Sequence, residues 1–163
     1  MIPQKIGLGG GCHWCTEAVF QSLKGVCKVK QGYISSINEN NYFSEAVLVY
    51  FDPKTIPLKD LIEIHLHTHK STSNHSFRKK YRSAIYYFEE IEKQNLEICL
   101  KEVQKDFDSP IITTVLKFNE FQASRDELLD YYQNNRNAPF CIKYIHPKLV
   151  FLKEKYTTVI KEF

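Results

Sequence analysis

Three consecutive glycines precede two cysteines near the start of the chain, and these residue types suit nucleophilic chemistry. The segment Gly9–Cys15 reads Gly-Gly-Gly-Cys-His-Trp-Cys and runs into a stretch with a helical pattern. Glycine permits a sharp turn and a close approach of backbone and ligand. A cysteine between such a turn and a helix faces the positive end of the helix dipole, which favours the thiolate over the thiol. We therefore interpret Cys12 as a nucleophile rather than as a small buried side chain.

Two further residues are candidates for acting on a substrate oxygen. Glu45 precedes the apolar run Ala46–Phe51, and strand alternation puts it on the same face as Val47. Desolvation on an apolar face favours the protonated carboxyl group, which can donate a proton near neutral pH. Tyr81 begins a strand-like segment directly after a polar loop, where its hydroxyl can serve a site while its ring stays packed. A solvated glutamate and a ring that caps the core are the structural alternatives.

Two other patterns leave different functions open. Cys12 and Cys15 form a C-x-x-C pair, as in thioredoxin-like disulfide exchangers, although only a brief strand and the glycines precede the pair. His65 and His69 share a helix face at a spacing that metal ligands use. No acidic ligand pattern such as His-Glu-x-x-His accompanies them, so no metal is expected. The whole histidine cluster comprises His65, His67, His69 and His75.

Length and composition favour one ordinary globular domain. The chain has 163 residues, 43% hydrophobic and 25% charged, with a formal net charge of +3 from interspersed charges, so no nucleic-acid-binding patch is indicated. We see neither the pattern of a signal peptide nor an apolar stretch long enough to span a bilayer. We therefore expect a cytoplasmic monomer with no membrane association. The odd number of cysteines, five, argues against a disulfide scaffold.

The apolar patterns predict a mixed α/β chain. Strands are expected at 5–8, 26–36, 46–51, 83–88 and 110–118, and helices at 14–23, 58–67, 89–106 and 125–134. Two β-α-β passes predict an α/β (α+β) plait, with helices packed on a two-layer, ferredoxin-like sheet. The single domain then spans 1–163, with 135–163 as an extended C-terminal tail. Cys27 and Cys99 fall within a predicted strand and helix and are interpreted as core residues.

These motifs make the chain similar to the A-type peptide methionine sulfoxide reductases. The resemblance implies reduction of the S epimer of methionine sulfoxide, free or in proteins. It implies that Cys12 attacks the sulfoxide sulfur and becomes a sulfenic acid, while Glu45 protonates the oxygen. Tyr81 and Tyr42 would hydrogen-bond that oxygen, and Trp14 and His13 would receive the substrate methyl group. The matching segments are Gly9–Trp14 with Glu17, Gly25–Val26, Gly32–Tyr33, Ser44–Val47, Tyr50–Pro53, Asp60–Glu63 and Tyr81–Tyr86.

The same resemblance implies how the enzyme is recycled. A second thiol would convert the sulfenic acid to a disulfide, which thioredoxin would then reduce without any bound cofactor. Cys141, in the predicted tail, is the preferred resolving thiol because a tail can swing toward an open pocket. Cys15 is the alternative, although a pair three residues apart at a helix start is expected to need distortion before it reaches disulfide geometry.

Several departures from the family pattern fall at this site. His13 stands where the family usually has phenylalanine, and Cys15 stands where glycine is commoner. The loops before Glu45 and before Tyr81 are short. The acidic residue that the family has in the second loop is absent from this chain, which has Ser76 at about that position. The predicted methyl pocket is therefore more polar than usual and can titrate.

Overall fold

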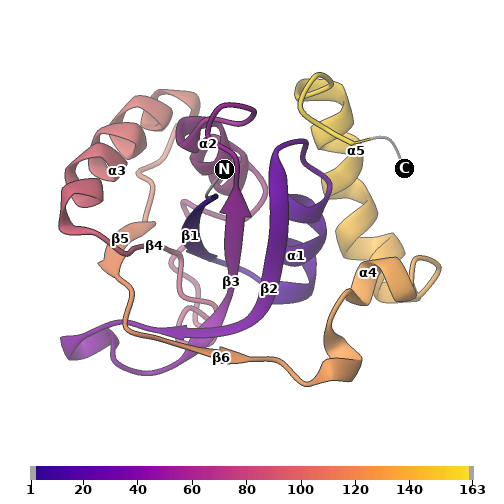
Figure 1. Cartoon of the computed structure of the whole chain (residues 1–163), viewed down its shortest axis with the longest axis horizontal. Coiled ribbons are helices and arrows are strands. Elements are labelled where there is room, and N and C mark those ends of the chain that lie inside the picture. The colour runs from indigo at the N-terminus through magenta and orange to yellow at the C-terminus, as the bar shows by residue number, and fades with distance from the viewer. Residues whose placement is uncertain (1–2, 162–163) are drawn as a thin grey trace.

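Six strands form one curled sheet in the computed structural model, which describes residues 3–161 (Figure 1). Their order is β5-β4-β1-β3-β2-β6, and neighbours are antiparallel except for the parallel pair β4 and β5. The mixed α/β class predicted from the sequence is confirmed at this level. The strands are β1 (Gln4–Gly9), β2 (Val26–Ser35), β3 (Ser44–Phe51), β4 (Ala84–Tyr87), β5 (Thr114–Lys117) and β6 (Glu120–Ala123).

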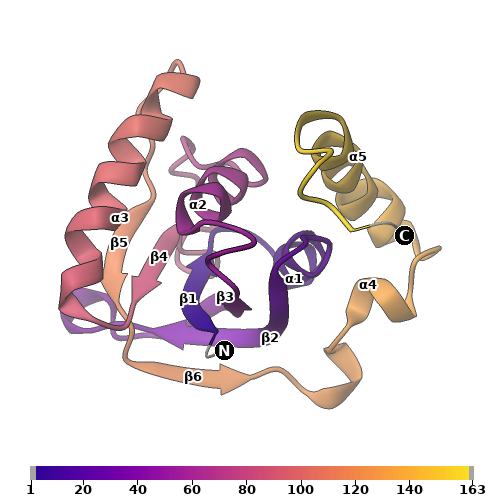
Figure 2. The same ribbon diagram turned by 45° about the horizontal axis from the view of Figure 1, so that its top comes forward.

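Two of the helices connect strands that lie near the centre of the sheet. Helix α1 joins β1 to β2, which flank β3, and helix α2 joins β3 to β4. Both helices lie over the same side of the sheet, and α5 lies beyond α1 (Figure 2). The helices are α1 (His13–Gln21), α2 (Leu58–His67), α3 (Glu90–Val103), α4 (Tyr131–Asn134) and α5 (His146–Lys155), with a π-helical turn η4 (Cys141–Ile145) and 3-10 turns η1 (Asn38–Asn40), η2 (Gln104–Asp106) and η3 (Asp126–Leu128).

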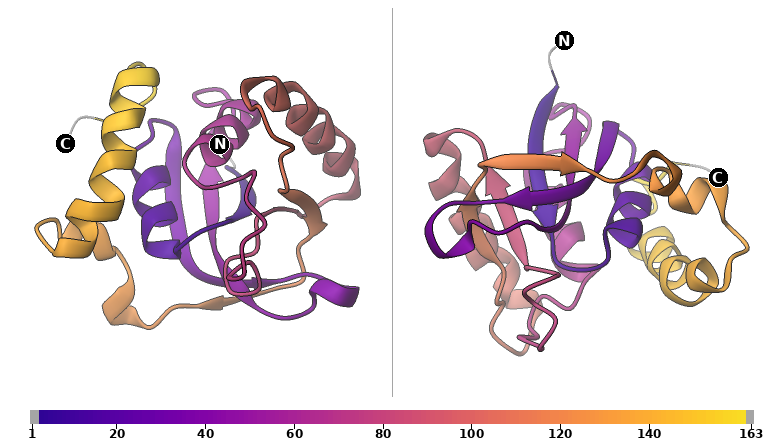
Figure 3. Two further views of the ribbon diagram at one scale, coloured as in Figure 1. Left: turned by 180° about the vertical axis from the view of Figure 1, so that it is seen from behind. Right: turned by 90° about the horizontal axis from the view of Figure 1, so that it is seen from below.

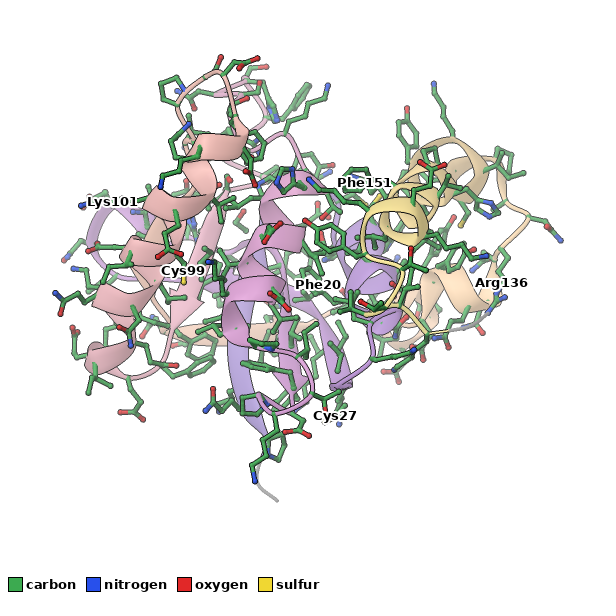
Figure 4. The ribbon with its side chains drawn as sticks, turned by 90° about the horizontal axis from the view of Figure 1, so that it is seen from above. Phe20, Cys27, Cys99, Lys101, Arg136 and Phe151 are labelled. Atoms are coloured by element: carbon green, nitrogen blue, oxygen red, sulfur yellow. The ribbon has the colours of Figure 1, made fainter. Side chains whose placement is uncertain are left out.

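The central strands are buried on both faces, which explains why β3 is a continuous apolar run rather than an alternating one. Val47, Val49 and Phe51 face the main core under α1 and α2. Ala46 and Leu48 face a smaller cluster on the opposite side of the sheet. Figure 4 shows Phe20 of α1 directed into the main core between the helices. This double burial holds β3, and with it Glu45, in a fixed position.

The C-terminal region differs from the predicted extended tail over 135–163. Residues 141–155 form η4 and α5, and α5 runs alongside α1 (Figure 3). Leu149 and Leu152 are buried in the main core, so packing of these side chains stabilises the helix against α1. Pro147 lies in the first turn of α5, a position that favours helix initiation.

Two other elements differ from their predicted bounds. The helix expected at 125–134 is divided into η3 and α4, because Asp130 between them adopts a left-handed conformation with a φ of 53°. Strand β5 is shorter than the expected 110–118, and β6 was not predicted. Within the described residues, no helix is long and apolar enough to cross a membrane.

Candidate active site

A turn between β1 and α1 positions Cys12 at the first residue before the helix. The backbone carbonyl of Cys12 accepts hydrogen bonds from the N–H groups of Cys15 and Thr16, at 3.1 and 3.2 Å. The turn requires glycine at residue 10, because a Cβ atom there would overlap the ring of His69. The predicted nucleophile therefore lies at the positive end of α1. The turn before it has no room for a side chain at residue 10.

The sulfur of Cys12 is surrounded by groups that favour its thiolate. A hydrogen bond from the Cys15 thiol is the largest effect, and it lowers the pKa of Cys12 despite the opposing effect of burial. Hydrogen bonds from the backbone N–H groups of Trp14 and Cys15 lower this pKa further. The pKa of Cys15 is raised by the same thiol–thiol hydrogen bond, so Cys15 remains the proton donor of the pair.

The other cysteines are placed differently from one another. Cys141 is fully buried at the start of η4, near enough to Cys15 to raise the pKa of that thiol. Burial also raises the pKa of Cys141 itself. Cys27 is exposed, which corrects its assignment to the core, and Cys99 is only partly buried against the main core. Figure 4 shows Cys99 on α3, well separated from Cys27.

A cavity of about 400 Å³ opens beside Cys12 and brings together most of the predicted site residues. The structure places there, from three separate parts of the chain, the predicted nucleophile, the predicted acid, the loop tyrosine and the two residues after the nucleophile. It adds five residues that sequence reasoning did not single out for the site. The full lining is Cys12, His13, Trp14, Tyr33, Phe43, Glu45, Lys80, Tyr81, Leu128 and Phe140.

Glu45 is 6% exposed at the start of β3 and faces the N-terminus of α1. Its Oε1 atom accepts a hydrogen bond from the backbone N–H of His13 at 3.2 Å and lies 3.4 Å from His13 Nε2. Its Oε2 atom lies 3.7 Å from the ammonium of Lys80. Glu45 is the only acidic residue in the described lining of this cavity. A second acid is not expected there, because Ser76 stands at about the position of the acidic loop residue of the family.

Aromatic rings form one wall of the cavity. Trp14 stacks on Tyr131 with ring centroids 4.0 Å apart and meets Phe140 edge-on at 5.3 Å. Tyr131 is held in place by Glu17, whose buried carboxylate accepts the backbone N–H groups of Asp130 and Tyr131, each at 3.1 Å. The wall beside Trp14 therefore depends on contacts between α1 and α4, which are far apart in the sequence.

A tyrosine with no predicted role lines the cavity, whereas the predicted Tyr42 does not. Tyr42 does not line the cavity, because its ring lies 4.7 Å from the Arg82 guanidinium instead. Tyr33 lines it, since β2 pairs Tyr33 directly with Glu45 across the sheet. Cross-strand partners project to the same face, so the strand register brings Tyr33 to the acid. The Gly32–Tyr33 match in the sequence was a signal for this position.

The histidine cluster is divided by the fold. His65 is buried and its Nε2 contacts the Gly9 carbonyl at 2.9 Å, while His69 contacts Ser83 and the His65 carbonyl. Burial lowers the pKa of His65 to about 4 and that of His69 well below its ordinary value. His67 faces Asp106 at 3.0 Å. The ring nitrogens of His65 and His69 therefore bond to other groups of the protein. The two residues do not form a metal-binding pair as their i, i+4 spacing allows.

A second cavity, of about 630 Å³, also borders Cys12 and reaches Cys15. Its described lining contains no aspartate or glutamate and includes Lys70 and Lys148. Burial lowers the pKa of Lys148, whereas its attraction to the two cysteine sulfurs acts in the opposite direction. The two thiols therefore face a basic cavity.

Comparisons with known proteins find relatives that match most of the chain. The chain is 35% identical, over an alignment of 169 positions, to the peptide methionine sulfoxide reductase MsrA of Psychrobacter sp., covering 94% of this chain and 96% of the relative. It is 33% identical over 156 residues to the corresponding protein of Sulfolobus acidocaldarius, covering 87% and 89%.

Solved structures share the fold. The reduced form of Mxr1 from Saccharomyces cerevisiae matches with a TM-score of 0.76 and 21% identity, over 88% of this chain and 91% of that one. Methionine sulfoxide reductase A of Corynebacterium diphtheriae matches with a TM-score of 0.68 and 22% identity, over 82% and 76%. The family model for peptide methionine sulfoxide reductase matches residues 4–159. The chain therefore belongs to the peptide methionine sulfoxide reductase family.

Proposed function

We propose that this enzyme reduces the S epimer of methionine sulfoxide with Cys12 as the attacking thiolate. The observation that supports this most directly is the 400 Å³ cavity, in which a sulfur of lowered pKa lies with one buried carboxyl group and an aromatic wall. The thiolate attacks the sulfoxide sulfur, and the oxygen takes one proton from Glu45. The resulting hydroxyl group then moves to the Cys12 sulfur while its bond to the substrate sulfur and the bond between the two sulfurs break. The products are methionine and the sulfenic acid of Cys12, so two electrons pass from the cysteine to the sulfoxide.

The other cavity residues position the substrate in this proposal. Tyr81 and Tyr33 donate hydrogen bonds to the sulfoxide oxygen, and Lys80 compensates the charge that remains on Glu45. Trp14, with Phe140 beside it, receives the methyl group. An oxygen held on one side and a methyl group on the other fix the hand of the sulfur centre, which supports selectivity for one epimer.

Cys15 is the resolving thiol that the geometry favours, which reverses the preference for Cys141. Cys15 already donates a hydrogen bond to the Cys12 sulfur. Cys12 lies outside the helix, with φ −59° and ψ 128°, so its side chain is not constrained by helical geometry. The Cys15 thiol displaces hydroxide from the sulfenic acid, which leaves as water with the thiol proton, and the two sulfurs form a disulfide. Cys141 is buried and would need the C-terminal helices to move.

Thioredoxin is the proposed reductant of this disulfide. Mxr1, which shares the fold, has been solved in complex with Trx2, with a TM-score of 0.64 and 22% identity. The basic cavity that reaches Cys15 gives a second thiol access to the pair. A thiolate of the reductant attacks one sulfur and releases the other, and the second thiol of the reductant completes the exchange.

Single-turnover measurements test the roles of the nucleophile and the acid. We expect Cys12→Ser to abolish methionine formation from the S sulfoxide, and Glu45→Gln to slow it while Cys12 remains open to alkylation. Removing a proton donor of this kind typically costs a factor of about 100 to 10,000. Unchanged turnover in Cys12→Ser would remove that residue from its assigned role, and an unchanged rate in Glu45→Gln would exclude the acid.

A thiol–disulfide exchanger is the second candidate, favoured by the hydrogen-bonded Cys12–Cys15 pair at the helix start. Reduction of insulin disulfides separates the two functions. Insulin reduction in the absence of sulfoxide reduction would select the exchanger, whereas the reductase predicts sulfoxide reduction as the main activity.

A further inference from the structure

The contact between His13 and Glu45 fixes the proton on the imidazole ring. His13 Nδ1 lies 2.7 Å from the backbone carbonyl of Gly32. A carbonyl oxygen only accepts hydrogen bonds, so Nδ1 carries the proton. In the neutral imidazole, Nε2 then has a lone pair and no proton. That bare nitrogen lies 3.4 Å from Oε1 of Glu45.

Two unprotonated acceptors facing each other in a buried site repel, unless one proton lies between them. The side chains here are 4% and 8% exposed, so little water can separate them. Burial lowers the pKa of the His13 imidazole, with the Gly32 contact and the Glu45 charge opposing. A neutral acid–imidazole pair is favoured over an imidazolium–carboxylate pair where both side chains are this buried, so the shared proton is expected on the carboxyl oxygen, which donates it toward Nε2.

We propose that His13 is a positioning residue for the proposed sulfoxide reduction, which presents a bare Nε2 to Glu45 and so keeps that carboxyl group in its proton-donating form. This inference rests on the proposed function and concerns a residue that replaces the usual phenylalanine. It assigns His13 a part in proton supply in addition to contact with the substrate.

Several charged and polar groups surround the His13–Glu45 pair, and His13 supplies the acceptor for the proton of the acid. The backbone N–H of His13 and the Lys80 ammonium lie 3.2 Å and 3.7 Å from the carboxyl oxygens of Glu45. Cys12 lines the same cavity, and the bare Nε2 is the acceptor that faces Oε1. Tyr33 contributes a ring edge with its centroid 5.1 Å from that of His13, and Tyr81 lines the same cavity.

The same arrangement suits the state after proton transfer. Once the sulfoxide oxygen has taken the proton, Glu45 is a carboxylate beside a neutral imidazole. The ammonium of Lys80 then compensates its charge, because the contact with Tyr81 and the charge of Glu45 raise the pKa of Lys80 and keep it protonated. Solvent supplies the next proton to the carboxylate before the following turnover.

Carbon-13 NMR of labelled glutamate tests the inference without relying on activity. We expect the titration midpoint of the Glu45 carboxyl to fall by about one pH unit or more in His13→Phe, since the acceptor of the acid proton is lost. Phenylalanine is the residue usual at this position in the family, so the variant is expected to fold. An unchanged or higher midpoint in His13→Phe would overturn the proposal.

Two further measurements distinguish this role from simple packing. Nitrogen-15 NMR of labelled histidine should find His13 protonated on Nδ1 and bare on Nε2 near neutral pH, and the opposite tautomer or an imidazolium contradicts the inference. In single turnover, the alkaline limb of the pH profile should move by the same amount as the carboxyl midpoint. A uniform loss of rate at every pH would indicate packing alone. If Cys12→Ser were active, the proposed function would fail while both NMR results stood.

Discussion

Four kinds of interaction act on the Cys12 sulfur, and their effects on its pKa oppose one another. The hydrogen bond from Cys15 lowers the pKa most, burial raises it, the backbone N–H groups at the helix start lower it, and Glu45 raises it when its carboxyl group is ionised. The helix terminus alone is therefore not the main source of thiolate character. A cysteine at position 15 both prepares the nucleophile and supplies the proposed resolving thiol.

Replacing Cys15 by alanine and by serine separates these two contributions. Cys15→Ala removes the hydrogen-bond donor, so the pKa of Cys12 should rise and alkylation below that pKa should slow, about tenfold for each unit. Cys15→Ser keeps a donor and should alkylate at close to the original rate. Mass spectrometry of the Cys12 peptide after a timed exposure to iodoacetamide measures both. Equal slowing in the two variants would contradict the hydrogen-bond effect.

Residue-level reasoning was most successful where the signal was local. Cys12, Trp14 and Tyr81 lie in continuous motifs, and the structure places all three in the 400 Å³ cavity. Tyr33 and Leu128 reach the same cavity only through strand pairing and through the chain that follows β6. No spacing in the sequence encodes such a contact, because register and long-range packing decide it.

At the scale of elements, α2 is joined to the end of β1 by one buried histidine. His65 on α2 contacts the Gly9 carbonyl at 2.9 Å, directly before the turn that holds Cys12. The centroid of the His65 ring lies 4.3 Å from that of His69 and 6.1 Å from that of Phe20. The position of the nucleophile turn is therefore linked to a helix that contributes none of the proposed catalytic groups.

This buried histidine makes the free energy of unfolding depend on pH. The pKa of His65 falls from 6.5 to about 4 on folding, so the unfolded chain binds more protons between those values. The contribution of His65 to stability should be complete above the unfolded value and fall as the pH drops toward the folded one, by about 2 kcal/mol from about pH 7.5 to about pH 5. Urea unfolding at both pH values measures this. His65→Gln should reduce the difference, and an equal pH dependence in the two proteins would refute it.

Element boundaries were least predictable where local pattern and tertiary packing disagree. The central strands were predicted because their apolar runs are long and uninterrupted. Strand β6 is short and largely exposed, and it forms by pairing with β2 rather than through an apolar pattern of its own. Helix α5 was missed because its apolar residues form one short continuous run, Leu149–Leu152, with no helical spacing, although Pro147 at its first turn was a usable signal.

For the whole molecule, the packing of the C-terminal helices bears on which thiol resolves the sulfenic acid in the proposed cycle. Phe140 lines the substrate cavity while the next residue, Cys141, is fully buried, so one short segment serves both the site and the core. α5 continues from η4 and closes the main core against α1. Releasing Cys141 toward Cys12 would therefore expose apolar surface, whereas Cys15 needs no such opening.

Oxidation by one equivalent of the sulfoxide tests this consequence. We expect both Cys141→Ser and the parent protein to form the Cys12–Cys15 disulfide, and Cys15→Ser to stop at a sulfenic acid that dimedone traps. Amide hydrogen exchange over 141–155 should be the same before and after oxidation, because the helices stay packed. A Cys12–Cys141 disulfide with faster exchange in that segment would show instead that the helices open during each catalytic cycle.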